Sequence, residues 1–185
     1  MKSHLDKVMW FSVFFFFSDL PLWITAGLNI HNMMYYYIRD LWVHMLIIGI
    51  YYFVLDSPVK KRIIILIEII LLLIGILSIL VSKDVPAELS SIYKLAVILA
   101  IFMHFHSIIS ELKITSLLNY PFFWISSGAL IFSCGSIFIM LFYKYTINIQ
   151  TPKIFIIYTH FLDIMGILMF IFIEIGFLSA KKKYL

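Results

Sequence analysis

The chain has 185 residues, of which 63% are hydrophobic and 13% are charged, whereas soluble domains average about half and about a quarter. A soluble fold cannot bury that much apolar surface, so the composition predicts an integral membrane protein organised as a single domain. The net charge of +4 is the difference between 14 Lys and Arg residues and 10 Asp and Glu residues. The basic residues lie at the ends of apolar segments and do not form the basic stripe of a nucleic-acid-binding protein. We therefore expect the lipid bilayer, and no nucleic acid, as the chain's surroundings.

Six apolar segments are each long enough to cross a hydrocarbon core of about 30 Å at about 1.5 Å per residue. They predict an all-α fold, a polytopic membrane bundle of six transmembrane helices. The expected spans are residues 8–30, 34–55, 62–82, 90–112, 120–143 and 153–178. Polar residues or prolines separate the spans, and no connector is long enough to form a soluble domain.

The first span has an alternative interpretation as a cleaved signal peptide. Lys2 and Lys7 precede it, and Ala26 is a small residue near its end. Asp19 and Trp23 would make a poor cleavage region, so we expect the segment to be retained as an uncleaved helix.

The distribution of Lys and Arg predicts the orientation, because positively charged loops stay in the cytoplasm. With six spans, the side of the two termini receives Lys2, Lys7, Lys60, Lys61, Arg62, Lys113, Lys181, Lys182 and Lys183, and the other side receives Arg39, Lys83, Lys94, Lys144 and Lys153. The first set is the larger, so we expect a multi-pass protein of the cell membrane with both termini in the cytoplasm.

Ionisable side chains within the spans are the candidate functional residues, because each is costly at membrane depth and normally faces a protein interior or a wet cavity. Counting about 1.5 Å per residue from each midpoint places five of them within about 7 Å of the midplane. These five residues are Asp19, His44, Glu68, His104 and Asp163. His160, nearer the end of the last span, shares a helical face with Asp163. Five predicted helices thus contribute to one polar layer.

This layer has two interpretations. It is a ligand site or pathway for a proton, a cation or a polar ligand, with His44 or His104 titrating beside Asp19, Glu68 or Asp163. Alternatively, neutral carboxyl and imidazole groups join helices through hydrogen bonds worth about 0.6 kcal/mol each. The remaining ionisable groups lie near span ends or on other faces, where we expect structural or snorkelling roles. They are Asp40, His106, Glu111 and Glu174.

The fifth span lacks charge and contains a series of small residues. Gly128, Ala129, Ser133 and Gly135 would let a neighbouring helix approach closely, so they predict helix packing. Catalysis by Ser133 or Cys134 is disfavoured because no paired base lies nearby in the sequence.

Motifs of soluble enzymes are absent: the chain has no GxSxG, HExxH, CxxC, phosphate loop or GxGxxG. We predict no catalytic residue and no metal site, since His104 and His106 point about 200° apart on a helix. A haem held by two of His44, His104 and His160 remains conceivable, and the cofactor stays unknown.

The stretch Tyr120–Trp124, followed by Ser126 to Gly135, resembles a family of bacterial multi-span membrane modules. These modules occur alone or as the N-terminal membrane region of sensor histidine kinases, and a Pro-x-Phe-Trp signature opens their penultimate span. The segment Leu20–Gly27 is similar to the family's first span. The resemblance implies a sensory membrane domain in the bacterial inner membrane, without catalytic residues to carry over. No coiled-coil linker or kinase follows within the 185 residues, so we expect any signal to pass to a separate protein.

Three functional hypotheses follow. The first is a sensory or ligand-binding membrane module that acts through a separate partner or a second copy of itself. The second is a small ion- or proton-coupled transporter or channel subunit, for which Pro21 supplies the only helix break within a span. The third is a membrane enzyme that acts on a lipid or quinone through His160 and Asp163.

Overall fold

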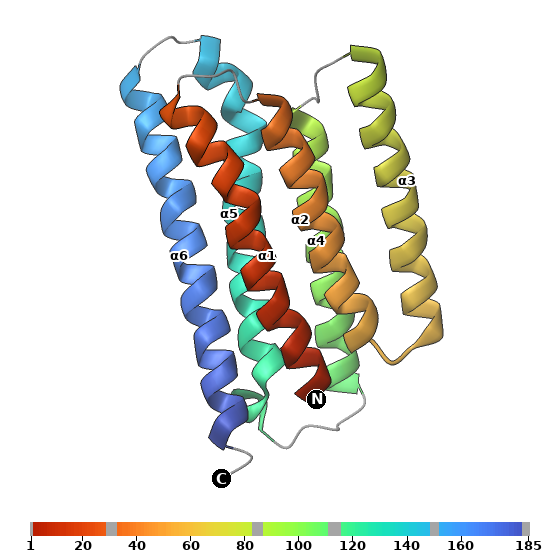
Figure 1. The fold of residues 1–185 in the computed structure, drawn as a ribbon. Helices are drawn as coiled ribbons and strands as arrows, with labels where there is room; N and C mark the ends of the chain where they lie inside the picture. The colour runs from red at the N-terminus through yellow and green to blue at the C-terminus, as the bar shows by residue number, and fades with distance from the viewer. Residues whose placement is uncertain (1, 29–32, 83–86, 111–115, 149–151, 183–185) are drawn as a thin grey trace. The chain divides into compact units, whose positions relative to one another are not determined.

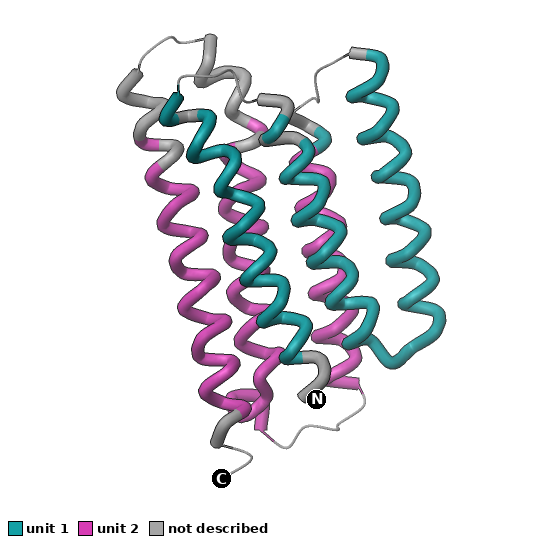
Figure 2. The backbone as a smooth tube through the Cα atoms, viewed as in Figure 1, with its two compact units in different colours: residues 1–89 teal, residues 90–185 magenta. Residues whose placement is uncertain are grey.

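The computed structural model describes residues 2–28, 33–82, 87–110, 116–148 and 152–182. Within these ranges the chain is helical and contains no strand, so the predicted all-α class is confirmed. The helices are α1 (Lys2–Gly27), α2 (Met33–Val54), α3 (Pro58–Ser82), α4 (Ala87–Ser110), the 3₁₀ turn η1 (Leu117–Asn119), α5 (Pro121–Asn148) and α6 (Pro152–Lys182) (Figure 1). The chain divides into two compact units, residues 1–89 and residues 90–185 (Figure 2).

Five helices in the described part of the chain are long and apolar enough to cross a membrane. Their qualifying segments are Leu5–Thr25, Pro58–Val81, Leu89–Ser110, Pro121–Ile139 and His160–Ala180. The helix α2 has 22 residues but carries Arg39 and Asp40. The structure therefore supports a multi-pass membrane protein and leaves α2 as the sixth candidate span.

The helices extend beyond several predicted span ends. The first begins at Lys2 and not at residue 8, and the last two run on to Asn148 and Lys182. Hydropathy marks only the apolar part of a helix, whereas the backbone hydrogen bonds continue through polar residues. The predicted ends at residues 30 and 112 lie outside the described residues. Three helices, α3, α5 and α6, begin at a proline, whose fixed φ suits the first helical position.

In the first unit, α1, α2 and α3 run in alternating directions, and α2 contacts both of the others (Figure 1). Phe11 and Phe15 of α1 pack with Val43 of α2 in a buried cluster. Leu46, Ile47 and Ile50 pack against this cluster. Because spacings of three, four and seven residues fall on one helical face, a single stripe of each helix forms the α1–α2 seam.

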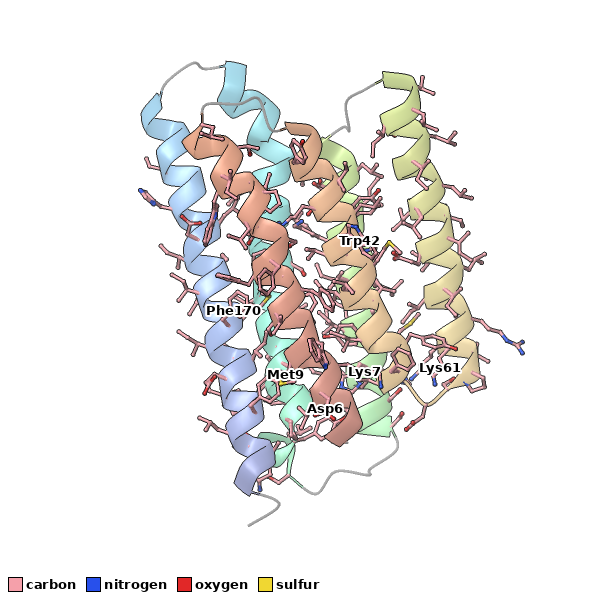
Figure 3. The ribbon with its side chains drawn as sticks, in the orientation of Figure 1. Asp6, Lys7, Met9, Trp42, Lys61 and Phe170 are labelled. Atoms are coloured by element: carbon pink, nitrogen blue, oxygen red, sulfur yellow. The ribbon has the colours of Figure 1, made fainter. Side chains whose placement is uncertain are left out.

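Two lysines lie over aromatic rings at one end of the first unit (Figure 3). The Nζ of Lys7 lies 4.4 Å from the ring centroid of Phe53, and that of Lys61 lies 5.2 Å from the ring centroid of Tyr52. Basic side chains beside aromatic rings are typical of a membrane–water interface. This end of the unit therefore carries the residue types that are common where helices meet the membrane–water interface.

In the second unit, α5 and α6 form a close antiparallel pair (Figure 1). A Cβ atom at Gly128 would lie 2.7 Å from the Phe172 Cβ and 3.0 Å from the Met169 carbonyl oxygen. On the opposing helix, a Cβ at Gly176 would lie 2.9 Å from the Pro121 carbonyl oxygen. Gly135 faces the flexible side chain of Met165. The two backbones thus approach closely because glycine occupies these positions.

We expect Gly128→Ala to lower the free energy of unfolding by about 1–3 kcal/mol, because the added methyl would overlap the α6 backbone and force the helices apart. The midpoint of unfolding in an SDS titration, followed by circular dichroism, measures the change. Gly166→Ala on α6 is the matched control, since its Cβ meets nothing within 4 Å, and it should leave the midpoint unchanged or raise it. Equal midpoints for the two variants would contradict this account of the α5–α6 contact.

Candidate functional site

An ion pair joins α1 to α2 at one end of their apolar seam. Arg39 Nε lies 2.8 Å from Asp19 Oδ1, and the two side chains are 16% and 20% exposed. Asp19 follows Phe15 by four residues, and Arg39 precedes Val43 by four, so both groups stay on the faces that form the seam. The guanidinium also lies 4.6 Å from the Phe15 ring centroid. The Nε–H direction is not aligned with the carboxylate, so the contact is an ion pair and not a linear hydrogen bond.

A second polar contact joins α2 to α3. His44 Nδ1 lies 3.2 Å from Glu68 Oε2, and the side chains are 4% and 14% exposed. The contact between Tyr52 and Lys61 fixes the register near the turn. His44 lies about two helical turns before Tyr52, and Glu68 lies about two turns after Lys61, so the antiparallel helices bring them level.

The helix α2 carries the central groups of both contacts. Arg39 and His44 are separated by about 140° around its axis, so one faces α1 and the other faces α3. Asp40, which is buried, lies between them in azimuth and one turn before His44. We call the five residues Asp19, Arg39, Asp40, His44 and Glu68 the α2 cluster. It holds three carboxyl groups, one guanidinium and one imidazole.

The α2 cluster contains more carboxyl groups than guanidinium groups. Arg39 remains positively charged and compensates one carboxylate, Asp19, which it contacts. The Glu68 carboxylate faces the His44 imidazole, and Asp40 is buried one turn before His44. The α2 cluster thus gathers carboxyl groups, an imidazole and a guanidinium on α2 and the two helices that it contacts.

The structure places His104 in the second unit, in aromatic surroundings. Its side chain is buried, and its ring centroid lies 6.0 Å from that of Tyr120 and 6.2 Å from that of Phe122. Phe122 meets the imidazole edge to face. Tyr120 joins η1 to α5 and Phe122 lies in the first turn of α5, so His104 packs α4 against the start of α5.

The Pro-x-Phe-Trp segment has a packing role in this structure. Pro121 opens α5, and Trp124 Nε1 donates a hydrogen bond of 2.9 Å to the Leu118 carbonyl oxygen. The Trp124 ring lies 5.9 Å from that of Phe172 on α6. The segment thus connects η1, α5 and α6.

His160 and Asp163 lie on an exposed face of α6. His160 Nδ1 is 4.0 Å from Asp163 Oδ2, one turn along the same helix, and both side chains are 72% exposed. The structure thus brings Asp19, His44 and Glu68 together through α2, whereas His104, His160 and Asp163 belong to the second unit.

The predicted packing residues of α5 differ in their surroundings. Gly128 and Gly135 face α6, as described above. Ser133 is 3% exposed and Ala129 is partly buried. Cys134 is exposed.

Two members of the α2 cluster were not selected as site residues from the sequence. In the sequence, Arg39 is one of the basic residues that predict the orientation, and Asp40 is one of the residues expected to have a structural or snorkelling role. The match between Asp19 and Arg39 becomes visible only with the helix ends of the structure, because Asp19 lies eight residues before the end of α1 and Arg39 lies six residues after the start of α2. An antiparallel helix pair therefore brings them to one level.

In the described residues, no three His, Cys, Asp or Glu side chains gather as metal ligands do. Comparison of the chain with protein-family models, with curated proteins and with solved structures gives no match. The functional argument therefore rests on the residues and contacts described above.

Proposed function

We propose that the chain is a six-span membrane protein whose α2 cluster binds a proton and whose protonation state is passed to a separate partner protein. The observation that carries the proposal is the contact of 3.2 Å between His44 and Glu68 beside the buried Asp40. Ionisable groups held at membrane depth mark proton and ion sites in membrane proteins, and we assign the proton to Glu68, whose carboxylate faces the His44 imidazole. The family resemblance of the Tyr120–Trp124 segment supports a sensory role in a bacterial inner membrane.

The composition of α2 is compatible with a sixth span. Its 22 residues would extend about 33 Å, which matches the hydrocarbon core. Arg39 contacts Asp19, and Asp40 is buried, so neither charge needs to face lipid. Six spans place both termini on one side, and the cluster Lys60, Lys61 and Arg62 supports a cytoplasmic location for that side.

Proton uptake tests the proposal. Purified protein in detergent is stepped from alkaline to acidic pH, and bound protons are counted with an indicator dye. We expect Glu68→Gln to bind fewer protons than the wild type, because its amide cannot accept one. Asp6→Asn is the matched control, since Asp6 is exposed at the start of α1 and should lose only an ordinary surface carboxyl. Uptake by Glu68→Gln equal to wild type across pH 5–8 would reject the proton site.

Proton transport is the second candidate function, and Pro21 favours it. This proline lies inside α1, two residues after Asp19, and removes the intrahelical hydrogen bond to the carbonyl four residues earlier. Transporters place such helix breaks beside their ion sites. Liposomes with an entrapped pH dye separate the two functions. Flux that Glu68→Gln abolishes would establish transport, whereas uptake without flux above protein-free liposomes would support the sensory module.

A further inference from the structure

Four basic side chains gather at one end of the first unit, and we call them the basic rim. They are Lys7 of α1 and Lys60, Lys61 and Arg62, which lie within the first five residues of α3. The helices α1 and α3 begin at this end, and α2 ends there (Figure 1). Lys7 and Lys61 each lie over an aromatic ring in the last turn of α2. All three helices of the unit therefore contribute to the basic rim.

The basic rim carries an excess of positive charge. Among the described side chains at this end of the unit, Asp6 and Asp56 are the acidic ones, so four cations face two anions. The first turn of α3 holds no acidic residue, although a helix N-terminus favours acidic side chains over basic ones. The N-terminus of α1 adds further partial positive charge, and the C-terminus of α2 offsets that of one N-terminus. A bound anion would stabilise this arrangement.

The basic rim lies where the apolar part of the helices begins. The apolar segments of α1 and α3 are Leu5–Thr25 and Pro58–Val81, so each basic residue falls within the first five residues of a segment. At about 1.5 Å per residue, their Cα atoms lie within about 6 Å of the segment's end. Long basic side chains reach outward from this depth to the headgroup layer. In a bilayer crossed by these segments, the four charges are within reach of lipid phosphate groups.

Exposed apolar stripes continue from two of the basic residues toward the middle of their helices. Trp10 and Phe14 follow Lys7 by three and seven residues, and each is 56% exposed. Leu66 follows Arg62 by four residues and is 60% exposed. Because residues three, four and seven apart share a helical face, each charge lies at the end of an apolar surface. The acyl chain of a lipid would pack along such a surface, whereas a soluble anion would make no contact with it.

We propose that the basic rim binds the headgroup of an anionic phospholipid. The phosphate group is common to such lipids and to inorganic phosphate, and the adjoining apolar stripes favour the lipid. Lysine binds phosphate as a point charge, and the Arg62 guanidinium has the fork geometry for two parallel hydrogen bonds to phosphate oxygens. Basic clusters at the ends of membrane helices attract anionic lipids in this way. The inference uses no residue of the α2 cluster and does not depend on the proposed proton site.

Quenching of tryptophan fluorescence by brominated lipids tests the site, because Trp10 is exposed one turn after Lys7. The protein is placed in phosphatidylcholine vesicles that contain brominated phosphatidylglycerol or brominated phosphatidylcholine, and comparison with Trp10→Phe isolates the Trp10 signal. Both lipids carry a phosphate, but phosphatidylglycerol alone has a net negative charge. We expect phosphatidylglycerol to bind beside Trp10 more strongly, on the order of tenfold.

Paired substitutions locate the preference for the anionic lipid. Lys7→Gln with Lys61→Gln should abolish most of it, whereas Lys7→Arg with Lys61→Arg keeps both charges and should retain it. Lys181→Gln with Lys182→Gln is the matched control, because it removes two lysines at the end of α6 in the second unit. Circular dichroism reports the helix content of each variant.

Three results would overturn the proposal. The first is equal quenching of the wild type by the two lipids, which needs no variant. The second is an equal loss of preference in the two glutamine variants, because general charge attraction would then account for the binding. The third is displacement of phosphatidylglycerol by inorganic phosphate at constant ionic strength, which would assign the basic rim to a soluble anion.

Discussion

Replacing Asp19 by Asn is expected to lower the free energy of unfolding by about 3 kcal/mol, because it leaves the Arg39 guanidinium charged and partly buried without its carboxylate. Arginine cannot lose its proton in a protein, so Arg39 stays charged when the carboxylate is removed. The midpoint of SDS unfolding, followed by circular dichroism, measures the effect.

Asp6→Asn on the same helix makes the same chemical change at an exposed position and should shift the midpoint by less than about 0.5 kcal/mol. The double variant Asp19→Leu with Arg39→Met removes both charges and should recover most of the loss, since apolar residues of similar volume replace buried ion pairs well. If Asp19→Asn were as stable as Asp6→Asn, the ion pair would not hold α1 against α2.

A smaller loss is expected for His44→Leu, about 2 kcal/mol, because Glu68 loses its partner but can be neutralised by a proton. The double variant His44→Leu with Glu68→Leu should recover part of this loss, because it removes both groups of the contact. The unfolding midpoints of the wild type, the single variants His44→Leu and Glu68→Leu, and the double variant form a complete double-mutant cycle.

This cycle separates structural stabilisation from function. If the double variant folds normally but binds fewer protons than the wild type, the His44–Glu68 pair contributes to proton binding. If the loss of stability in the double variant equalled the sum of the losses in the two single variants, His44 and Glu68 would not interact, contrary to the contact at 3.2 Å.

The helical class could be predicted from the sequence because long apolar segments in lipid must satisfy their own backbone hydrogen bonds. The contacts at Gly128 and Gly135 follow from the same logic, since small residues at regular spacing allow close approach. Hydropathy does not determine helix ends, which continue into polar residues such as Lys2 and Lys182.

The candidate site could be predicted only in part. The depth of a residue follows from its position along a span, and this placed Asp19, His44 and Glu68 at similar levels. The depth of a residue does not give the direction of its side chain around the helix axis or the residues that it contacts. His160 and Asp163, for example, lie on an exposed face of α6. Arg39 escaped selection because a basic residue near a span end has the same sequence signal whether it faces water or a carboxylate.

The most direct test of the proton site is infrared difference spectroscopy of the carboxyl groups during a pH titration of the wild type and Glu68→Gln. We predict a carboxyl band in the wild type that appears as pH falls and is missing from the spectrum of Glu68→Gln, with Asp6→Asn unchanged in that band. A band of equal intensity in the wild type and Glu68→Gln would show that Glu68 does not take up the proton, and would contradict the α2 cluster as the functional site.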